Sequence, residues 1–205
     1  GKEFSQNLQS LRGAGLFFSF TTDPLLPETM ELTAQGVKTC VENGVNVKVL
    51  TKRADFIDNF FGLLASYGNF DEKQYREHMA FGFTLTGHDE LERGTSSNIE
   101  RIGAMEELHN RGYRIFASIE PIVDFPSSMQ MINGSLPFCD LYKIGLMSGN
   151  GVTYDPVEAQ NFLSELQQLP GQPKIYLKNS LVRFLGVDRK TLPENFVESN
   201  YNMFG

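Results

Sequence analysis

Short apolar runs recur along the chain at intervals of roughly thirty residues, which is the spacing of strand-and-helix repeats. The runs are nearly continuous in apolar residues, and this pattern indicates strands that are buried on both faces of a parallel sheet. We predict six strands: LFFSF (16–20), VKVLT (47–51), AFGFTL (80–85), RIFASI (114–119), LYKIGLM (141–147) and KIYLK (174–178).

The segments between these runs have the period of amphipathic helices. Residues 27–44 carry apolar positions near one face. In residues 97–112, Ser97 and Glu100 have the spacing of a capping box, and Gly112 closes the segment. We also predict a helix from Asp155 to Pro170, and two short helices within residues 54–79 that are broken near Tyr67-Gly68-Asn69.

The alternation of strands and helices predicts an α/β fold with parallel strands. No Gly-x-Gly-x-x-Gly follows the first strand, which argues against a dinucleotide-binding sheet. Polar residues follow the strand ends, where parallel barrels build their sites, so we favour a partial TIM-type (βα) barrel. We predict one domain over residues 1–205, with a core at about 14–180 and a C-terminal extension at 186–205, which either covers the barrel or frays.

Composition narrows the function classes. The net charge of −7 argues against broad binding to a nucleic-acid backbone, because that affinity comes from Lys and Arg. The chain has neither an apolar run long enough for a transmembrane helix nor a signal peptide, so we expect a soluble, cytoplasmic protein with no membrane partner. Cys40 and Cys139 are far apart, and we interpret them as buried thiols.

Candidate site residues follow the first three predicted strands. Thr22 and Asp23 precede a proline, and they form either a turn or a ligand-binding edge. Lys52 is either a solvated lysine or a partner for an anionic group. Thr84 and Thr86 point to the same side of their strand, where they bind either a ligand or nearby backbone groups.

Further candidates follow the third predicted strand. Arg101 forms either a helix-surface ion pair or a bidentate contact with a carboxylate at the barrel mouth. Ser118 and Glu120 end the fourth strand, and a carboxylate there needs a partner. We name three lysines as that partner: Lys52, Lys143 and Lys178. No histidine has metal-ligand spacing, and His88 alone is considered for a site. We predict no metal ligands and no specific catalytic residue.

Taken in order, three segments resemble the core of radical S-adenosylmethionine enzymes, in particular the branch of spore photoproduct lyase. They are FFSFTTDPLLPE, then ENGVNVKVLTKR, then FGFTLTGHDELERGTSSNIERIGAMEELHNRGYRIFASIEPIV, and the resemblance covers roughly residues 16–150. It implies that Thr22 and Asp23 contact the methionyl amine, Lys52 the methionyl carboxylate, and Thr84 or Thr86 the ribose. It also implies that Arg101, Ser118 and Glu120 lie near the cofactor.

The sequence departs from that family in one large respect. The family holds a 4Fe-4S cluster on a Cys-x-x-x-Cys-x-x-Cys loop after its first strand, and this chain has only two distant cysteines. Either the first strand and cluster loop lie upstream of the non-methionine start, or the chemistry has been lost. We expect the full-length protein to use S-adenosylmethionine and the cluster, on an unidentified substrate, and this chain alone to bind no cofactor and to be inactive.

Two other functions remain as alternatives. One is a barrel lyase or aldolase that uses a Schiff-base lysine, with Lys52, Lys143 and Lys178 as candidates. The other is a non-catalytic binding module, for which an exposed sheet edge predicts a dimer.

Overall fold

The computed structural model describes residues 2–18, 22–149 and 152–205. Thr21 and Asn150, two polar residues near predicted strand ends, lie outside the described residues. The strands are β1 (Leu16–Phe18), β2 (Val47–Thr51), β3 (Met79–Thr84), β4 (Arg114–Ile122), β5 (Leu141–Leu146) and β6 (Lys174–Leu177). The α-helices are α1 (Lys2–Ala14), α2 (Pro27–Glu42), α3 (Ile57–Ser66), α4 (Glu72–His78), α5 (Asn98–Asn110), α6 (Phe125–Ser135), α7 (Pro156–Gln167) and α8 (Asn179–Leu185). Short 3₁₀ turns occupy η1 (Asp89–Leu91), η2 (Leu136–Phe138) and η3 (Arg189–Thr191).

The strands form one six-stranded sheet in the order β1-β2-β3-β4-β5-β6, and all neighbours are parallel. The order of the strands in space follows their order in the chain, without the reversal of a doubly wound sheet. The α/β class and the parallel strands are therefore confirmed. The arrangement is that of an open, barrel-like parallel sheet, and the TIM-type assignment stays a prediction.

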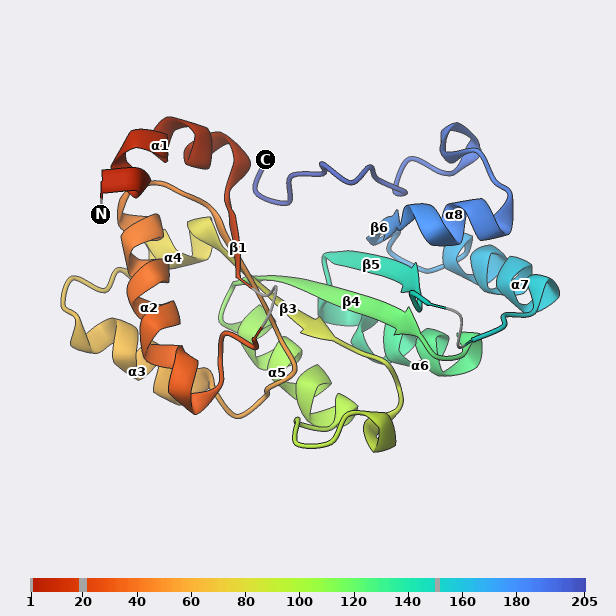
Figure 1. The fold of residues 1–205 in the computed structure, drawn as a ribbon, viewed down its shortest axis with the longest axis horizontal. Coiled ribbons are helices and arrows are strands. Elements are labelled where there is room, and N and C mark those ends of the chain that lie inside the picture. Colours follow the sequence, from red (N-terminus) through yellow and green to blue (C-terminus); the bar gives the residue numbers. More distant parts are fainter. Residues whose placement is uncertain (1, 19–21, 150–151) are drawn as a thin grey trace.

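The outer face of the sheet carries the larger core. Helices α2, α3, α5, α6 and α7 lie along this face (Figure 1). Buried residues such as Val49, Phe81, Ile115 and Ile144 point toward them from successive strands and belong to one continuous apolar cluster. This burial explains why the strands read as apolar runs, since removing apolar surface from water is the main driving force of folding.

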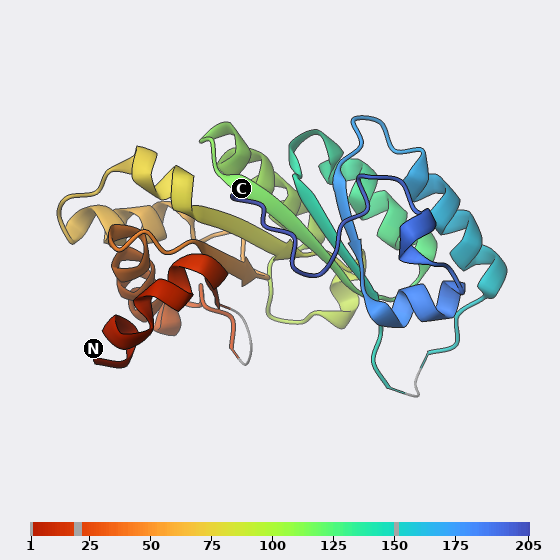
Figure 2. The same cartoon turned by 90° about the horizontal axis from the view of Figure 1, so that it is seen from above.

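The predicted helix boundaries have local chemical causes. The capping box of α5 is present, because Ser97 and Glu100 each bond the backbone of the other. The predicted break between α3 and α4 contains Gly68 and Asn69, both with positive φ, a conformation that ends a helix. The sequence did not predict α1, which lies beside α2 and β1 (Figure 2).

The inner face of the sheet is covered by the C-terminal segment, residues 187–205, which crosses the strands (Figures 1 and 2). Met203 is buried with Ala80, Phe116 and Leu141. The segment is also joined to β6, because the backbone of Val197 donates to that of Ile175. The segment thus lies over the inner face of the sheet, and its role as an extension over a barrel stays a prediction. None of the described helices combines the length and apolar character that crossing a membrane requires.

Candidate functional site

Asp23 joins the loop after β1 to the end of β2. One carboxylate oxygen accepts the backbone N–H of Leu25 at 3.0 Å, and the other accepts that of Lys52 at 2.7 Å. The hydroxyl of Thr51 lies 2.8 and 2.9 Å from the two oxygens. Asp23 thus fixes the backbone from which the Lys52 side chain starts, and its neighbour Thr22 is exposed at the same edge. The turn interpretation of Asp23 is confirmed, and a ligand contact stays a prediction.

Glu92 is the centre of the charged cluster at this edge, and the sequence analysis missed it. Its Oε1 lies 2.7 Å from the Lys52 ammonium, and its Oε2 lies 2.7 Å from Arg101 Nη1. The hydroxyl of Thr86 donates to the same Oε2 at 3.0 Å. Burial acts to raise the pKa of Glu92, but the hydrogen bonds and charges of Lys52 and Arg101 outweigh it, so the pKa lies below its usual value. Glu92 is therefore held as a carboxylate between two cations.

Arg101 is completely buried, so its interpretation as a helix-surface ion pair is wrong. It binds the carboxylate of Glu92, while Nη1 also donates to the Thr84 carbonyl at 2.8 Å. Nε and Nη2 donate to the Ser96 carbonyl and the Thr95 hydroxyl. The guanidinium is thus enclosed by acceptors from the β3–α5 loop and the end of β3. The arrangement positions Glu92, and Glu92 in turn positions Lys52.

The loop after β3 is also tied to the next loop along the sheet. His88 Nδ1 lies 2.6 Å from Glu90 Oε1, and Nε2 lies 2.5 Å from Asp124 Oδ2. Asp124 caps α6 by accepting the N–H of Ser127 at 2.7 Å. The hydrogen bond to Glu90 and then that to Asp124 raise the pKa of His88. His88 therefore links two strand-end loops, a role that needs no metal.

Ser118 and Glu120 lie on the inner face of the sheet, next to β5 and β6. Ser118 is in register with Thr84 on one side and Lys143 on the other. Glu120 forms an ion pair with Lys178, which selects one of the three predicted lysine partners. The pair passes over Gly145, where an added Cβ would stand 3.0 Å from Lys178 Cδ and 3.1 Å from Glu120 Oε1. A glycine at this position leaves room for the pair.

The structure thus brings the eight predicted residues to the carboxyl ends of neighbouring strands, as two groups. Thr22, Asp23, Lys52, Thr86 and Arg101 gather around β1–β3, while Ser118 and Glu120 lie on β4, and Thr84 stands between the groups. The charges of the predicted residues could have pointed to Glu92. Two predicted cations near the end of β3 needed an acidic partner there.

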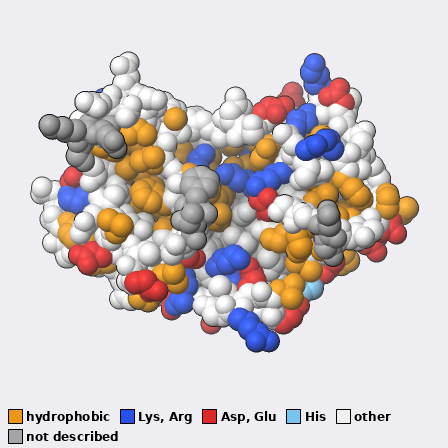
Figure 3. Space-filling view, in the orientation of Figure 1, with side chains coloured by type: hydrophobic (Ala, Val, Ile, Leu, Met, Phe, Trp, Pro, Cys, Tyr) orange, Lys and Arg blue, Asp and Glu red, His pale blue; other side chains and the backbone are white. Residues whose placement is uncertain are grey.

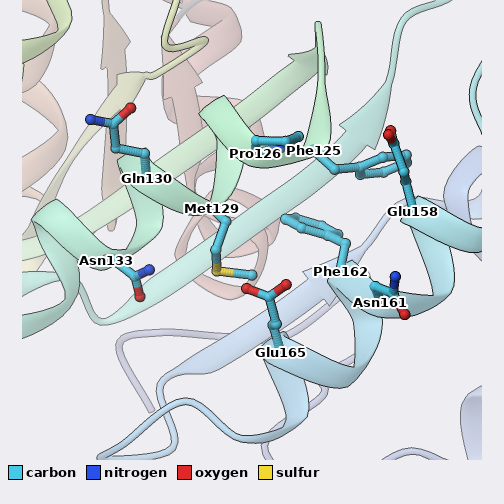
Figure 4. A pocket seen from close by; sticks show the side chains of 9 residues that line it. All are labelled: Phe125, Pro126, Met129, Gln130, Asn133, Glu158, Asn161, Phe162 and Glu165. Carbon is cyan, nitrogen blue, oxygen red and sulfur yellow. The ribbon is translucent and has the colours of Figure 1, made fainter.

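A separate groove lies on the outer side of the molecule, between α6 and α7 (Figure 4). It measures about 510 Å³, and its lining includes Phe125, Met129 and Phe162 together with the acidic Glu158 and Glu165. None of the predicted site residues lines it.

The described residues offer no ligand set for an iron–sulfur cluster. They contain no group of three or more His, Cys, Asp or Glu arranged for a metal ion. Cys40 and Cys139 are both buried, as predicted, and burial raises the pKa of Cys40 to about 11 and that of Cys139 to about 12. Iron–sulfur clusters need clustered thiolates. The cysteines present do not fit such a cluster.

Comparisons with protein-family models, with curated proteins and with solved structures gave no match for this chain.

Proposed function

We propose that the chain is the S-adenosylmethionine-binding core of a radical S-adenosylmethionine enzyme, built as a partial TIM-type barrel. One observation carries the proposal: the residues that the resemblance selects lie close together at one edge of a parallel sheet. Three separate segments supply them, and the rule that parallel barrels bind ligands at the carboxyl ends of their strands supports the assignment.

The contacts refine the proposed role of each residue. Lys52 keeps 41% of its side chain exposed while it pairs with Glu92, which supports the proposal that it contacts the methionyl carboxylate. Asp23 orients Lys52 through its hydrogen bonds to the backbone. Its carboxylate contacts the methionyl amine only through the lone pairs that these internal hydrogen bonds leave unused. Thr84 is the better ribose ligand, because Thr86 already donates to Glu92 and the Thr84 hydroxyl has no hydrogen-bond partner among the described residues.

We propose no radical step for this chain, because its cysteines do not fit the cluster. In the family that it resembles, the cluster supplies the electron that cleaves the sulfonium, and the cofactor carries the difficult chemistry while the protein orients it. The residues described here contribute binding and orientation.

The sequence led us to expect no cofactor on this chain alone, but the contacts proposed at the strand ends do not involve the cluster, so here we propose that the chain by itself binds S-adenosylmethionine. Calorimetric titration of the chain with S-adenosylmethionine tests this binding. We expect Lys52→Gln and Thr84→Val each to weaken binding by about tenfold, the effect of losing one good polar contact. Lys38→Gln is the matched control, because Lys38 pairs with Glu42 on the outside of α2. Equal affinities in all variants would refute the assignment.

A second experiment tests the enzyme. A polypeptide extended upstream by the preceding codons is expected to contain the cysteine triplet, to bind iron and sulfide, and to form 5′-deoxyadenosine under reducing conditions. An extended reading frame without three clustered cysteines would refute the radical-enzyme proposal even if this chain binds S-adenosylmethionine.

A Schiff-base lysine is the second candidate function, and among its three candidate lysines we favour Lys143. Lys52 and Lys178 are both held in ion pairs, whereas Lys143 has no acidic partner among the described residues. Burial, followed by the charges of Lys48 and Lys178, lowers the pKa of Lys143 to about 8. Its amine would attack a carbonyl carbon and release water to leave an imine. Borohydride trapping with small carbonyl compounds tests this, and no adduct on Lys143 would count against it.

A further inference from the structure

A second cavity lies on the inner face of the sheet, toward the amino-terminal ends of the strands. It measures about 160 Å³ and lies between the α1–β1 junction, β2, β5 and the C-terminal segment. Its apolar lining includes Phe17 from β1 and Phe204 from the C-terminal segment. Its position separates it from the Asp23 and Glu92 cluster, which stands at the carboxyl ends of the strands.

Every polar side chain that lines this cavity carries hydrogen-bond donors. They are the ammonium groups of Lys48 and Lys143 and the amides of Asn46 and Asn202. The amide oxygen of Asn46 lies 2.7 Å from His78 Nδ1, and that of Asn202 accepts the N–H of Phe204 at 3.1 Å. Both amide oxygens are thus used, and both NH₂ groups remain to donate. None of the described residues that line the cavity is acidic, although the chain has 25 acidic residues against 18 basic ones.

The two lysines have no counter-charge in the described part of the chain. Neither forms an ion pair or a hydrogen bond there, in contrast to Lys178, which is paired with Glu120. The Lys143 ammonium lies instead 5.1 Å from the ring centre of Phe17 and 4.9 Å from that of Phe116. The Lys48 ammonium lies 5.9 Å from that of Phe204. Aromatic faces attract cations but compensate less than an anion does.

We propose that this cavity binds a small molecule through a phosphate or carboxylate group, which lies between Lys48 and Lys143. The two ammonium groups supply charge, the two amides supply further donors, and the rings of Phe17 and Phe204 pack against the rest of the ligand. In the view of Figure 3, Lys and Arg side chains gather near the middle of the visible face, beside hydrophobic side chains. The site does not depend on the function proposed for the strand ends.

Occupancy of the site is linked to the protonation of Lys143. Three charged groups act on it from the neighbouring elements: Lys48 on β2 and Lys178 after β6 lower its pKa, and Glu120 on β4 raises it. Arg114 on β4 lies farther along the same face, with its guanidinium 5.1 Å from the ring centre of Phe204. A bound anion favours the charged amine, so it raises the pKa of Lys143 above about 8. Binding therefore weakens as the pH rises through and above this value.

The test uses inorganic phosphate and succinate as probes with the unmodified chain. Lysine labelling by acetic anhydride is followed at each lysine by mass spectrometry, between pH 6 and 10. We expect each probe to slow the labelling of Lys143 and to move its apparent pKa upward, with no change at the exposed Lys190. Unchanged labelling of Lys143 with both probes would overturn the proposal.

Variants locate the site. By calorimetry, Lys48→Gln and Lys143→Gln are each expected to weaken binding of the probes by about tenfold, since each removes one charge-assisted contact. Lys190→Gln changes the net charge equally and is expected to bind as the unmodified chain does. Equal weakening in all three variants would show that only overall charge is sensed, and weakening by Lys52→Gln alone would place the anion at the strand ends. Either result would overturn the proposal.

Discussion

The strand-end cluster around Glu92 and the inner cavity around Lys143 differ in whether their cations are paired with an acid. At the strand ends, two cations share one buried carboxylate, and each of the three guanidinium nitrogens of Arg101 donates to at least one acceptor. In the cavity, two ammonium groups repel each other, and neither forms an ion pair with an acidic side chain of the described residues. A compensated cluster stabilises its loop and holds side chains in place. A cluster of cations without an acid lowers the stability of the fold but leaves a site that an anion can occupy. Functional sites commonly combine lower stability with binding in this way.

The largest effect is expected when the compensated cluster is broken. Glu92→Gln leaves the buried Arg101 without its counter-charge, and we expect a loss of about 3–5 kcal/mol in the free energy of unfolding. Urea denaturation measures it. Glu90→Gln is the matched control because Glu90 is an exposed acid of the same loop, and we expect a far smaller change there than in Glu92→Gln. Similar losses in both variants would contradict the buried role of Glu92.

The second prediction concerns the packing of the inner face of the sheet next to the cavity. A Cβ at Gly82 would stand 2.1 Å from an atom of the Phe116 ring, which also contacts the Lys143 ammonium. Gly82→Ala is therefore expected to lower the free energy of unfolding by about 1–3 kcal/mol through overpacking. Gly103→Ala, in helix α5 with open space around it, should stabilise the protein by about 0.5–1 kcal/mol. A harmless Gly82→Ala would show that the ring moves freely.

The third prediction sharpens the comparison through pH. The pKa of Lys143 lies at about 8 in the folded chain and near 10.4 when unfolded, so the unfolded state binds more protons between these values. The Lys143 contribution to stability accordingly rises with pH across this window. Lys143→Met should remove that rise and leave stability at pH 7 unchanged or slightly higher. Chemical denaturation at pH 7 and pH 9.5 tests it, and a marked loss at pH 7 would contradict an uncompensated lysine.

The smallest expected effect belongs to His88, which lies between Glu90 and Asp124. Its pKa is raised in the fold, so its contribution is complete below the unfolded value near 6.5 and is lost as the pH rises through the folded value. His88→Asn should cost under about 1 kcal/mol at pH 5.5, because the partners are partly exposed. At pH 8.5 the cost should be smaller. An equal cost at both pH values would mean that charge plays no part.

The sequence was sufficient for the strands and most helices because their signals are local. Nearly continuous apolar runs mark β1 to β6, and the caps at Ser97 and Asp155 mark two helix starts. Helix α1 was missed, since its apolar residues Phe4, Leu8 and Leu11 are only partly buried against the core and its sequence is otherwise polar.

The candidate site was predictable only as a set of strand-end residues. Lys52, Lys143 and Lys178 look alike in sequence, because each lies in or next to a strand. Their different states depend on which acids the sheet register and the loops bring near: Glu92 for Lys52, Glu120 for Lys178, and none for Lys143 among the described residues. Pairings between distant segments of this kind are set by tertiary structure and leave no local pattern.

The C-terminal segment also bears on the order in which the two faces of the sheet form during synthesis. The outer face is covered by helices that lie next to their strands in the chain, so those contacts form as each unit leaves the ribosome. The inner face is covered only after Met203 has been synthesised, and its contact residue Ala80 is synthesised more than half a chain earlier. Contacts between such distant residues form late, because a long loop must close first. Until then the apolar residues of the inner face stay open to water, and this interval is when the nascent chain is most exposed to aggregation.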